Sequence, residues 1–501
     1  MNSAEDRQKA IQAKQGYNSF GPSGLKWEAD MQSKSIVHPF CALVALLPFA
    51  ACALTAQTAT VWLTTPDRSS LVAQQPDTLH FSATIGKNDS PTIAVDDAKK
   101  FQSIDGFGFA LTGGSAQLLM HMSAPARASL LKQLFSTDGD GIGVSYLRVS
   151  IGSSDMNAHV YSYDDMAAGE TDPTLAKFSL APDQVDVIPA MQEILAINPH
   201  IKILGSPWSA PAWMKSNDNA KGGTLKPEYY KAYAKYFVKY VEGMKAAGIT
   251  IDAITVQNEP LNPKNTPSMA MFAKQEDNFI KDALGPAFHK AGIRTKILIY
   301  DHNPDVTSYA LSILRDPDAR KYVDGSAWHL YGGGIAALTA VHDAFPNKNI
   351  YFTEQSITGR HHDRGIDISE PVSDVVIGAT RNWSKNVLLW NLAADPEDGP
   401  HTNDGGCTSC SGAITLDGDA ATLNVAYYVI AQVSKFVLPG SVRVGSNDVE
   451  QLANVAFRTP DGKMVLVVSN TGNFPTTFNV SYRGKTTTAT LPEGDVATYV
   501  W

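Results

Sequence analysis

The sequence lacks the patterns that mark nucleic-acid-binding proteins, metalloenzymes and dinucleotide-binding proteins. The formal net charge is −9 and no block of Lys and Arg occurs, whereas binding to phosphate backbones needs clustered positive charge. There is no HExxH motif and no paired Cys/His spacing, so neither a metal nor a cofactor is expected. No GxGxxG motif follows the first predicted strand. These absences favour a neutral or weakly charged substrate and exclude a nucleic-acid partner.

The composition also gives no sign of a disordered or fibrous chain. Hydrophobic residues make up 44% of the 501 residues and charged residues 18%, which is ordinary for a globular protein. This length suffices for one large domain and a smaller one, because a single core seldom grows beyond about 250–300 residues unless it closes as a barrel.

No apolar run near the N-terminus is long enough to span a bilayer. The run from Pro39 to Leu54 is shorter than the roughly 20 residues that a spanning helix needs, and small residues follow it. We interpret residues 1–56 as an N-terminal extension and a secretory signal peptide that starts at Met31; a buried core helix is the alternative. The protein is predicted to be secreted or periplasmic, with a lipid anchor at Cys52 as a further alternative and without stable membrane insertion of the mature chain.

Only two of the four cysteines lie beyond this leader. Cys407 and Cys410 form a CxxC pair with no second Cys/His pair beside it, which makes a poor zinc site. In an exported protein the pair predicts a local disulfide that holds a glycine-rich loop. A redox-active pair is the alternative, but no thioredoxin-like βαβ pattern surrounds it.

From residue 100 onward, short apolar runs that end in polar or aromatic residues alternate with helical stretches. Continuous apolar runs of this kind are typical of parallel strands covered on both faces. The predicted strands are Asp105–Leu111, Val144–Ser150, Ile201–Pro207, Asp252–Pro260, Thr295–Asn303, Ser326–Tyr331, Asn349–Gln355 and Asn386–Leu392. Eight such units in series predict an α/β fold, a (β/α)8 TIM barrel over residues 100–430, with a doubly wound open sheet as the rival.

One helix of the predicted barrel carries an aromatic stripe. Tyr229, Tyr233, Tyr236, Phe237 and Tyr240 fall on one helical face, between an N-terminal Pro227 and a closing Gly248. This spacing favours packing of the helix on the barrel over a sugar-stacking surface.

The pattern changes after about residue 430. Alternating segments separated by turn residues predict a small antiparallel β-sandwich over residues 431–501, and strand-like residues 57–99 are expected to join it. The sandwich is interpreted as a structural cap, with a carbohydrate-binding module as the alternative.

Two carboxylates close predicted strands on opposite parts of this barrel. Glu259 ends the fourth strand in an Asn-Glu-Pro context, and Glu354 ends the seventh in Thr-Glu-Gln. Since barrel active sites lie at the carboxyl ends of the strands, both side chains are expected to face one pocket. Paired carboxylates are the minimum apparatus for glycosidic cleavage, with a gap of about 5–5.5 Å implying retention and about 6.5–9.5 Å inversion. Structural, salt-bridged glutamates are the alternative.

The chain resembles glycoside hydrolase family 30, the glucosylceramidase-like enzymes of the large retaining (β/α)8 clan. The motifs that carry the resemblance run in family order from about residue 80 to the C-terminus. They are Gly106-Phe-Gly-Phe-Ala-Leu-Thr112, Leu147-Arg-Val-Ser-Ile-Gly152, Ser206-Pro-Trp-Ser-Ala-Pro-Ala-Trp-Met214, Gln257-Asn-Glu-Pro260, His329-Leu-Tyr331, Phe352-Thr-Glu-Gln355 and Trp390-Asn-Leu392.

The resemblance implies a role for each of the two glutamates. Glu259 is expected to be the acid/base, with its pKa held up so that it is protonated when it meets the leaving oxygen. Glu354 is expected to be the nucleophile and must stay ionised, and Arg148 is expected to lie beside it and keep it anionic. A plain buried ion pair is the alternative role for Arg148.

The remaining candidate residues are expected to bind or orient the sugar. Asn258 is predicted to hydrogen-bond the sugar 2-OH, and Trp208 and Trp390 to offer apolar faces to a pyranose. His329 and Tyr331 are predicted to orient the nucleophile, a core histidine being the alternative for His329. Asp301, His302 and Asn303 are predicted to lie at the rim or in a subsite.

One departure from glucosylceramidase bears on specificity. The resemblance implies an Asp after the Thr of the first strand that binds distal hydroxyls of glucose, but Gly113 follows Thr112 here. The Gly-Gly-Cys407-Thr-Ser-Cys410 loop looks like the branch of the family that contains β-1,6-glucanases. The sequence therefore predicts a retaining hydrolase of β-1,6-glucan. Glucosylceramidase, β-glucosidase or xylanase activity is the alternative within the family, and a non-catalytic carbohydrate-binding protein is the alternative of another class.

Overall fold

The computed structural model describes residues 57–83, 88–357 and 365–501. The predicted signal peptide and Cys52 lie outside the described residues. In the described part of the chain, none of the helices combines the length and apolar character needed to cross a bilayer.

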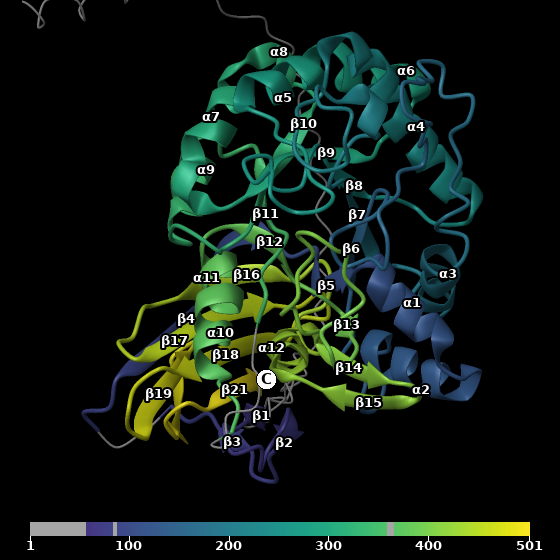
Figure 1. The fold of residues 1–501 in the computed structure, drawn as a ribbon. Coiled ribbons are helices and arrows are strands. Elements are labelled where there is room, and N and C mark those ends of the chain that lie inside the picture. Colours follow the sequence, from purple (N-terminus) through teal and green to yellow (C-terminus); the bar gives the residue numbers. More distant parts are fainter. Residues whose placement is uncertain (1–56, 84–87, 358–364) are drawn as a thin grey trace, which may run out of the picture. The chain divides into compact units, whose positions relative to one another are not determined.

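The predicted TIM barrel is confirmed as a closed ring of parallel strands (Figure 1). The barrel strands are β5 (Gly106–Leu111), β6 (Tyr146–Ser150), β7 (Lys202–Ser206), β8 (Ala253–Thr255), β9 (Lys296–His302), β10 (Val323–Trp328), β11 (Asn349–Phe352) and β12 (Ser384–Leu389). They pair in the order β5-β6-β7-β8-β9-β10-β11-β12 and close from β12 to β5. β8 is shorter than predicted and ends at Thr255, so Glu259 lies on the loop beyond it.

The barrel interior has two kinds of layer. A buried apolar cluster takes residues from successive strands, among them Tyr146 of β6 and Leu204 of β7. Arg148 and Ser206 lie two residues further along the same strands and on the same face, so they form a polar layer nearer the carboxyl ends. The interior of the barrel therefore changes from apolar to polar towards its mouth, where catalytic residues are expected.

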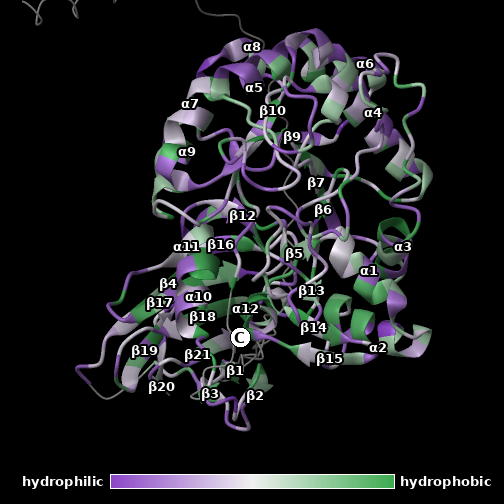
Figure 2. Cartoon of the chain, viewed as in Figure 1, coloured by the Kyte–Doolittle hydropathy of each residue, from purple (hydrophilic) through white to green (hydrophobic). Residues whose placement is uncertain are grey.

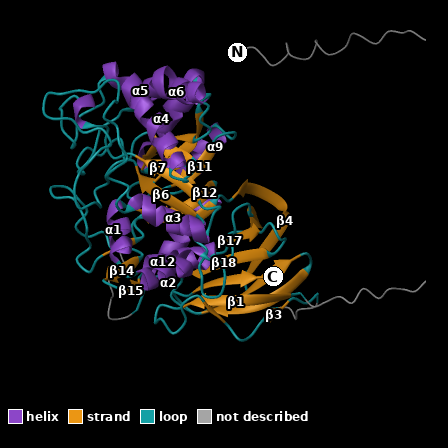
Figure 3. Ribbon diagram, turned by 90° about the vertical axis from the view of Figure 1, so that its right-hand side faces the viewer, coloured by secondary structure: helices purple, strands orange, loops and turns teal. Residues whose placement is uncertain are grey.

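Helices surround the barrel strands (Figure 3). The α-helices are α1 (Gly113–His121), α2 (Ala124–Phe135), α3 (Val187–Ile197), α4 (Tyr230–Ala246), α5 (Ala273–Phe279), α6 (Gly285–Ala291), α7 (Thr307–Arg315), α8 (Pro317–Arg320), α9 (Ala337–Ala344), α10 (Ser369–Pro371), α11 (Gly378–Arg381) and α12 (Val425–Ser434). Outer helices such as α4 carry both hydrophilic and hydrophobic residues, as expected for one face on the barrel (Figure 2).

The aromatic stripe of α4 packs inward as predicted. Tyr233, Tyr236, Phe237 and Tyr240 are fully buried, and Tyr163 stacks on the rings of Tyr236 and Tyr240. The stripe therefore belongs to the core.

A second β-rich part has its own apolar core. Its strands are β1 (Thr58–Thr64), β2 (Ala73–Gln74), β3 (Leu79–His80), β4 (Thr92–Ser103), β16 (Val442–Ser446), β17 (Leu452–Arg458), β18 (Met464–Asn470), β19 (Thr476–Tyr482), β20 (Lys485–Leu491) and β21 (Val496–Val500). They pair in the order β2-β1-β21-β18-β17-β16-β4-β19-β20, with β3 beside β1. The N-terminal β1 and β4 thus pair with C-terminal strands. Pairing is antiparallel except between β4 and β19, so the predicted antiparallel β-sandwich is confirmed with one parallel pair.

A smaller sheet follows the last barrel strand. It contains β13 (Ala393–Ala394), β14 (Ile414–Asp417) and β15 (Ala420–Leu423). Between β13 and β14 the chain makes the long loop that carries Cys407 and Cys410.

Candidate active site

The loops that follow β8 and β11 place Glu259 and Glu354 at the mouth of the barrel. Glu259 has a left-handed backbone with φ of 43°, and its amide donates to the carbonyl oxygen of Asp301. Glu354 comes directly after β11. Both residues are buried, with exposed fractions of 7% and 6%, yet both line one cavity of about 430 Å³. A cavity of this size is typical of a small-molecule site.

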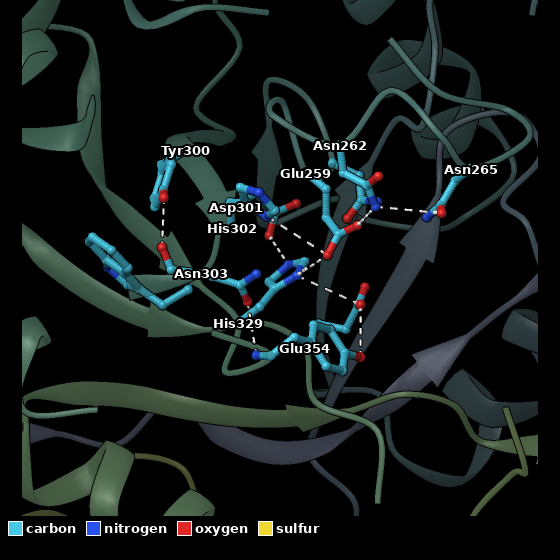
Figure 4. Close-up of polar contacts among 12 residues, drawn as sticks. Glu259, Asn262, Asn265, Tyr300, Asp301, His302, Asn303, His329 and Glu354 are labelled. Carbon is cyan, nitrogen blue, oxygen red and sulfur yellow. Dashed lines mark hydrogen bonds and ion pairs between the residues drawn. The ribbon is translucent and has the colours of Figure 1, made fainter. Parts of the chain in front are cut away.

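His329 joins the two carboxylates (Figure 4). Its Nδ1 atom lies 3.3 Å from Oε1 of Glu259 and 3.7 Å from Oε1 of Glu354. The two carboxylate oxygens are therefore no more than about 7 Å apart, a limit that includes the separation in retaining glycosidases and excludes most of the range of inverting ones. The arrangement leaves the two groups facing each other across a space that fits a sugar's anomeric centre.

A buried network of ion pairs and hydrogen bonds holds the side chains of Glu354 and His329 in place. Arg148 donates to Glu354, to Oδ1 of Asn258 at 2.6 Å and to Asp301 at 2.9 Å. Asp301 also accepts from Ser206 at 2.8 Å and Thr353 at 2.7 Å, and its Oδ1 lies 3.1 Å from Nε2 of His329. Breaking a buried ion pair is strongly destabilising. Arrangements that separate Arg148 from its carboxylate partners are therefore unfavourable, and the network keeps the side chains of the site in one geometry.

The two carboxylates differ in their electrostatic surroundings. Burial acts to raise the pKa of Glu259, but the hydrogen bond and charge of His329, with the amide of Asn262, lower it to about 2. Burial raises the pKa of Glu354 against the opposing charges of His329 and Arg148. The structure gives the reverse of the predicted order. The reason is that His329 lies nearer Glu259 than the nucleophile it was expected to orient.

His329 itself is a cation near neutral pH. Burial acts to lower its pKa, but the neighbouring carboxylates Glu354, Asp301 and Glu259 raise it to about 9. Glu259 and His329 thus share one proton across their hydrogen bond, and they titrate as a pair.

Most of the predicted sugar-binding residues meet in this cavity. Asn258, Trp208, Trp390, His302, Asn303 and Tyr331 all line it. The rings of Trp208 and Trp390 lie 5.4 Å apart, and the guanidinium of Arg148 lies 4.8 Å from the Trp208 ring. The Tyr331 hydroxyl donates to Glu354 Oε1 at 3.1 Å, so Tyr331 contacts the predicted nucleophile directly.

Asp301 does not lie at the rim, where we predicted it. Its side chain has no exposed surface and is saturated with partners, so it supports Arg148 and His329 and makes no contact with the cavity. The backbone at Tyr300 and Asp301 has φ of 76° and 54°, and this interrupts the alternation of side chains along β9. Arg148 is likewise fully buried and acts through Glu354 and Asn258.

The cavity also contains residues that sequence reasoning missed. Asn262 donates to Oε2 of Glu259 at 2.7 Å, and Asn265 and Ser356 complete the lining near it (Figure 4 labels both asparagines). Asp155, on the loop after β6, is 6% exposed and faces the same cavity with a buried Oδ1 atom that has no partner among the described residues. All four come from irregular loops, where no periodic pattern marks an inward side chain.

The position of Asp155 bears on the departure from glucosylceramidase at Gly113, the residue after Thr112. A Cβ atom on Gly113 would come within 1.9 Å of the Asn157 side chain, so that position has no room for a carboxylate. A third acid nevertheless enters the cavity, from the loop after β6. Gly113 itself supplies no carboxylate, and the additional acid that lines the cavity is Asp155.

The loop that carries Cys407 and Cys410 crosses the barrel mouth. The loop follows β12, which lies opposite β8 in the ring of strands. It nevertheless forms hydrogen bonds with the loop after β8. Thr266 donates from its amide to the Gly405 carbonyl at 3.2 Å, while Thr402 donates from its hydroxyl to the Thr266 carbonyl at 2.5 Å and from its amide to that of Asp155 at 2.9 Å. The predicted disulfide between Cys407 and Cys410 is present, and both cysteines line the cavity against Trp208 and Trp390.

Asp155 gives the site a distinctive pH dependence. Burial first, and then the charges of Glu354 and Glu259, raise its pKa from 3.8 to about 8. Between pH 3.8 and about 8, Asp155 is ionised in the unfolded chain and neutral in the folded chain. Its contribution to the free energy of unfolding is therefore fully present at low pH and is lost as the pH rises. We expect Asp155→Asn to gain stability relative to wild type by up to about 1.4 kcal/mol per pH unit over this window.

Thermal unfolding of both proteins across this pH range checks the prediction. The exposed Asp138→Asn is the control, and its difference from wild type should stay flat. A constant difference between Asp155→Asn and wild type would show that Asp155 is not held neutral.

Two family models match the chain. The glycosyl hydrolase family 30 TIM-barrel model covers residues 104–437, and the family 30 β-sandwich model covers residues 440–499. The chain belongs to glycosyl hydrolase family 30. It is therefore a glycoside hydrolase.

Individual relatives cover most of the chain. An endo-1,6-β-D-glucanase of Aspergillus fumigatus is 34% identical over 445 residues, which are 83% of this chain and 88% of the relative. The lysosomal acid glucosylceramidase of Mus musculus is 30% identical over 437 residues, covering 82% and 83%. A solved endo-β1,6-glucanase, BT3312, is 34% identical with a TM-score of 0.81 and covers 89% of this chain and 99% of its own.

Proposed function

We propose that the protein is a secreted, retaining β-glycoside hydrolase whose substrate is β-1,6-linked glucan. The observation that carries the reaction type is the pair Glu259 and Glu354, which face each other across one cavity at no more than about 7 Å. The substrate is supported by the 1,6-glucanases among the similar proteins. Export is supported by the leader pattern in residues 1–56 and by the Cys407–Cys410 disulfide.

In the first step Glu354 attacks the anomeric carbon. The C–O bond to the leaving sugar breaks, an ester forms between the glucosyl unit and Glu354, and the leaving oxygen takes a proton from the Glu259–His329 pair. Arg148 and Tyr331 hold the Glu354 carboxylate in line for the attack. Asn258, whose Oδ1 is occupied by Arg148, has its amide nitrogen free to donate to the sugar 2-OH.

In the second step water replaces the departed sugar. Glu259 is already an anion in the empty site and accepts a proton from this water, which attacks the anomeric carbon and releases Glu354 as a carboxylate. Two inversions at one carbon leave the product with the β configuration of the substrate.

The third acid and the tryptophans bind the rest of the glucosyl unit. Asp155 is neutral below its raised pKa, so it can donate its carboxyl proton to one sugar hydroxyl, and its Oδ1 atom, which has no partner among the described residues, can accept from another. Trp208 and Trp390 supply apolar ring surface for the C–H face of a pyranose.

Substrate choice is tested by comparing polysaccharides under the same conditions. Reducing sugar released from pustulan, a β-1,6-glucan, is expected to exceed that from xylan by at least about tenfold, and to exceed glucose released from glucosylceramide. Activity confined to xylan or to glucosylceramide would overturn the glucan assignment while leaving the glycosidase reaction intact.

A further inference from the structure

Glu259 and His302, which line the cavity, and the buried His329 beside them are arranged as metal ligands. The coordinating atoms of Glu259, His302 and His329 all lie within 4.8 Å of one another. Figure 4 shows the two rings and the carboxylate converging on one point. Glycosidic cleavage by two carboxylates does not require this geometry.

The separations match those of a first-row transition metal site. Nδ1 of His329 lies 3.3 Å from Oε1 of Glu259, and Nδ1 of His302 lies 3.8 Å from the same oxygen. Ligand atoms bound to a tetrahedral zinc ion at about 2.0–2.1 Å are separated by roughly 3.3 Å, so Glu259 and His329 already have this spacing and His302 must move closer to them.

The neighbours of the two histidines also suit a metal. His329 points its Nε2 atom at Oδ1 of Asp301, which is held in place by Thr353, and this leaves Nδ1 as the coordinating nitrogen. A carboxylate behind a histidine is the usual partner of a metal ligand. Nδ1 of His302 is buried and has no hydrogen-bond partner among the described residues, so an acceptor lone pair is available there.

We propose that Glu259, His302 and His329 form an inhibitory site for a borderline divalent cation such as Zn²⁺, Co²⁺ or Ni²⁺. Two imidazoles and one carboxylate favour these ions over Mg²⁺ and Ca²⁺, which prefer oxygen ligands. The bound ion occupies the lone pair that Glu259 needs for proton transfer, and its open position faces the substrate cavity. The expected inhibition rests on the proposed catalytic role of Glu259, whereas the expected metal binding does not.

Binding is tested first, without any substrate. Titration of Co²⁺ into the full-length protein at about pH 8, where the metal must displace the proton that His329 carries, is followed by the visible absorption of tetrahedral cobalt and by calorimetry. We expect one ion per chain, with at least a tenfold weaker affinity for His302→Gln and no change for His289→Gln, whose histidine lies on α6. Absence of binding in wild type, or equal affinity in His302→Gln, would overturn the proposal.

Inhibition is tested second, on pustulan and on an aryl β-glucoside. We expect Zn²⁺ to inhibit competitively, Mg²⁺ at the same concentration to have no effect, and EDTA to restore activity. Cobalt binding at this site without inhibition would contradict the inhibitory role. An enzyme that binds cobalt as expected but cleaves neither substrate would instead count against the proposed function.

Discussion

Glu354→Gln is expected to lower the turnover of pustulan by at least about 10⁴-fold, because the amide cannot attack the anomeric carbon. Each tenfold loss corresponds to about 1.4 kcal/mol in the activation barrier, so the effect amounts to more than about 5 kcal/mol. Gln keeps the size of the side chain and can accept from Tyr331, so the variant should still fold and bind oligosaccharide.

Kinetics and calorimetry on the same variant separate catalysis from binding. The control is Glu242→Gln on the exposed face of α4, which should retain wild-type turnover. Turnover of Glu354→Gln within tenfold of wild type would remove Glu354 from the nucleophile's role.

Glu259→Ala is expected to affect substrates according to their leaving groups. Pustulan has a poor leaving oxygen that needs a proton, so its kcat/KM should fall by about 10²–10⁴-fold. 2,4-Dinitrophenyl β-glucoside has a leaving group that departs without protonation, and its kcat/KM should change by less than about tenfold. Hydrolysis of the glucosyl-enzyme should become slow, because no base activates the water, and dinitrophenolate should therefore appear as a burst.

Stopped-flow measurement of dinitrophenolate release checks this expectation. Equal losses of kcat/KM on both substrates, with no burst, would show that Glu259 does not transfer the proton. Asn262→Ala provides a graded comparison, since it removes only the hydrogen bond to Oε2 of Glu259 and leaves the carboxylate in place.

The barrel and its carboxylates were accessible from the sequence for a physical reason. Parallel strands covered on both faces require continuous apolar runs, and the residue that ends such a run must lie at the barrel mouth. Glu259 and Glu354 were found in this way, although β8 ends earlier than predicted.

Residues outside this pattern were missed or misplaced. Asn262 and Asp155 lie in loops whose course depends on tertiary contacts, so no spacing marks them. Asp301 was predicted to lie at the rim or in a subsite, whereas the backbone at Tyr300 and Asp301 is left-handed and the carboxylate is fully buried. The position of His329 between two acids was also not predictable, and it reversed the expected order of their pKa values.

The contacts of the loop that carries the disulfide were likewise not predictable from the sequence. The sequence predicted the Cys407–Cys410 bond and a local role for it. The hydrogen bonds from Thr402 to the loops after β6 and β8 join residues far apart in the chain, so no local pattern indicated that this loop forms a wall of the cavity.

The central claim is that Glu354 forms a covalent bond to the sugar while Glu259 faces it across the cavity. Incubation with 2-deoxy-2-fluoro-β-glucosyl fluoride slows the release of this intermediate and allows the labelled peptide to be identified by mass spectrometry. We expect one fluoroglucosyl group per chain, attached to Glu354. A label on another residue, or no label on an enzyme that cleaves β-glucosides, would contradict the account.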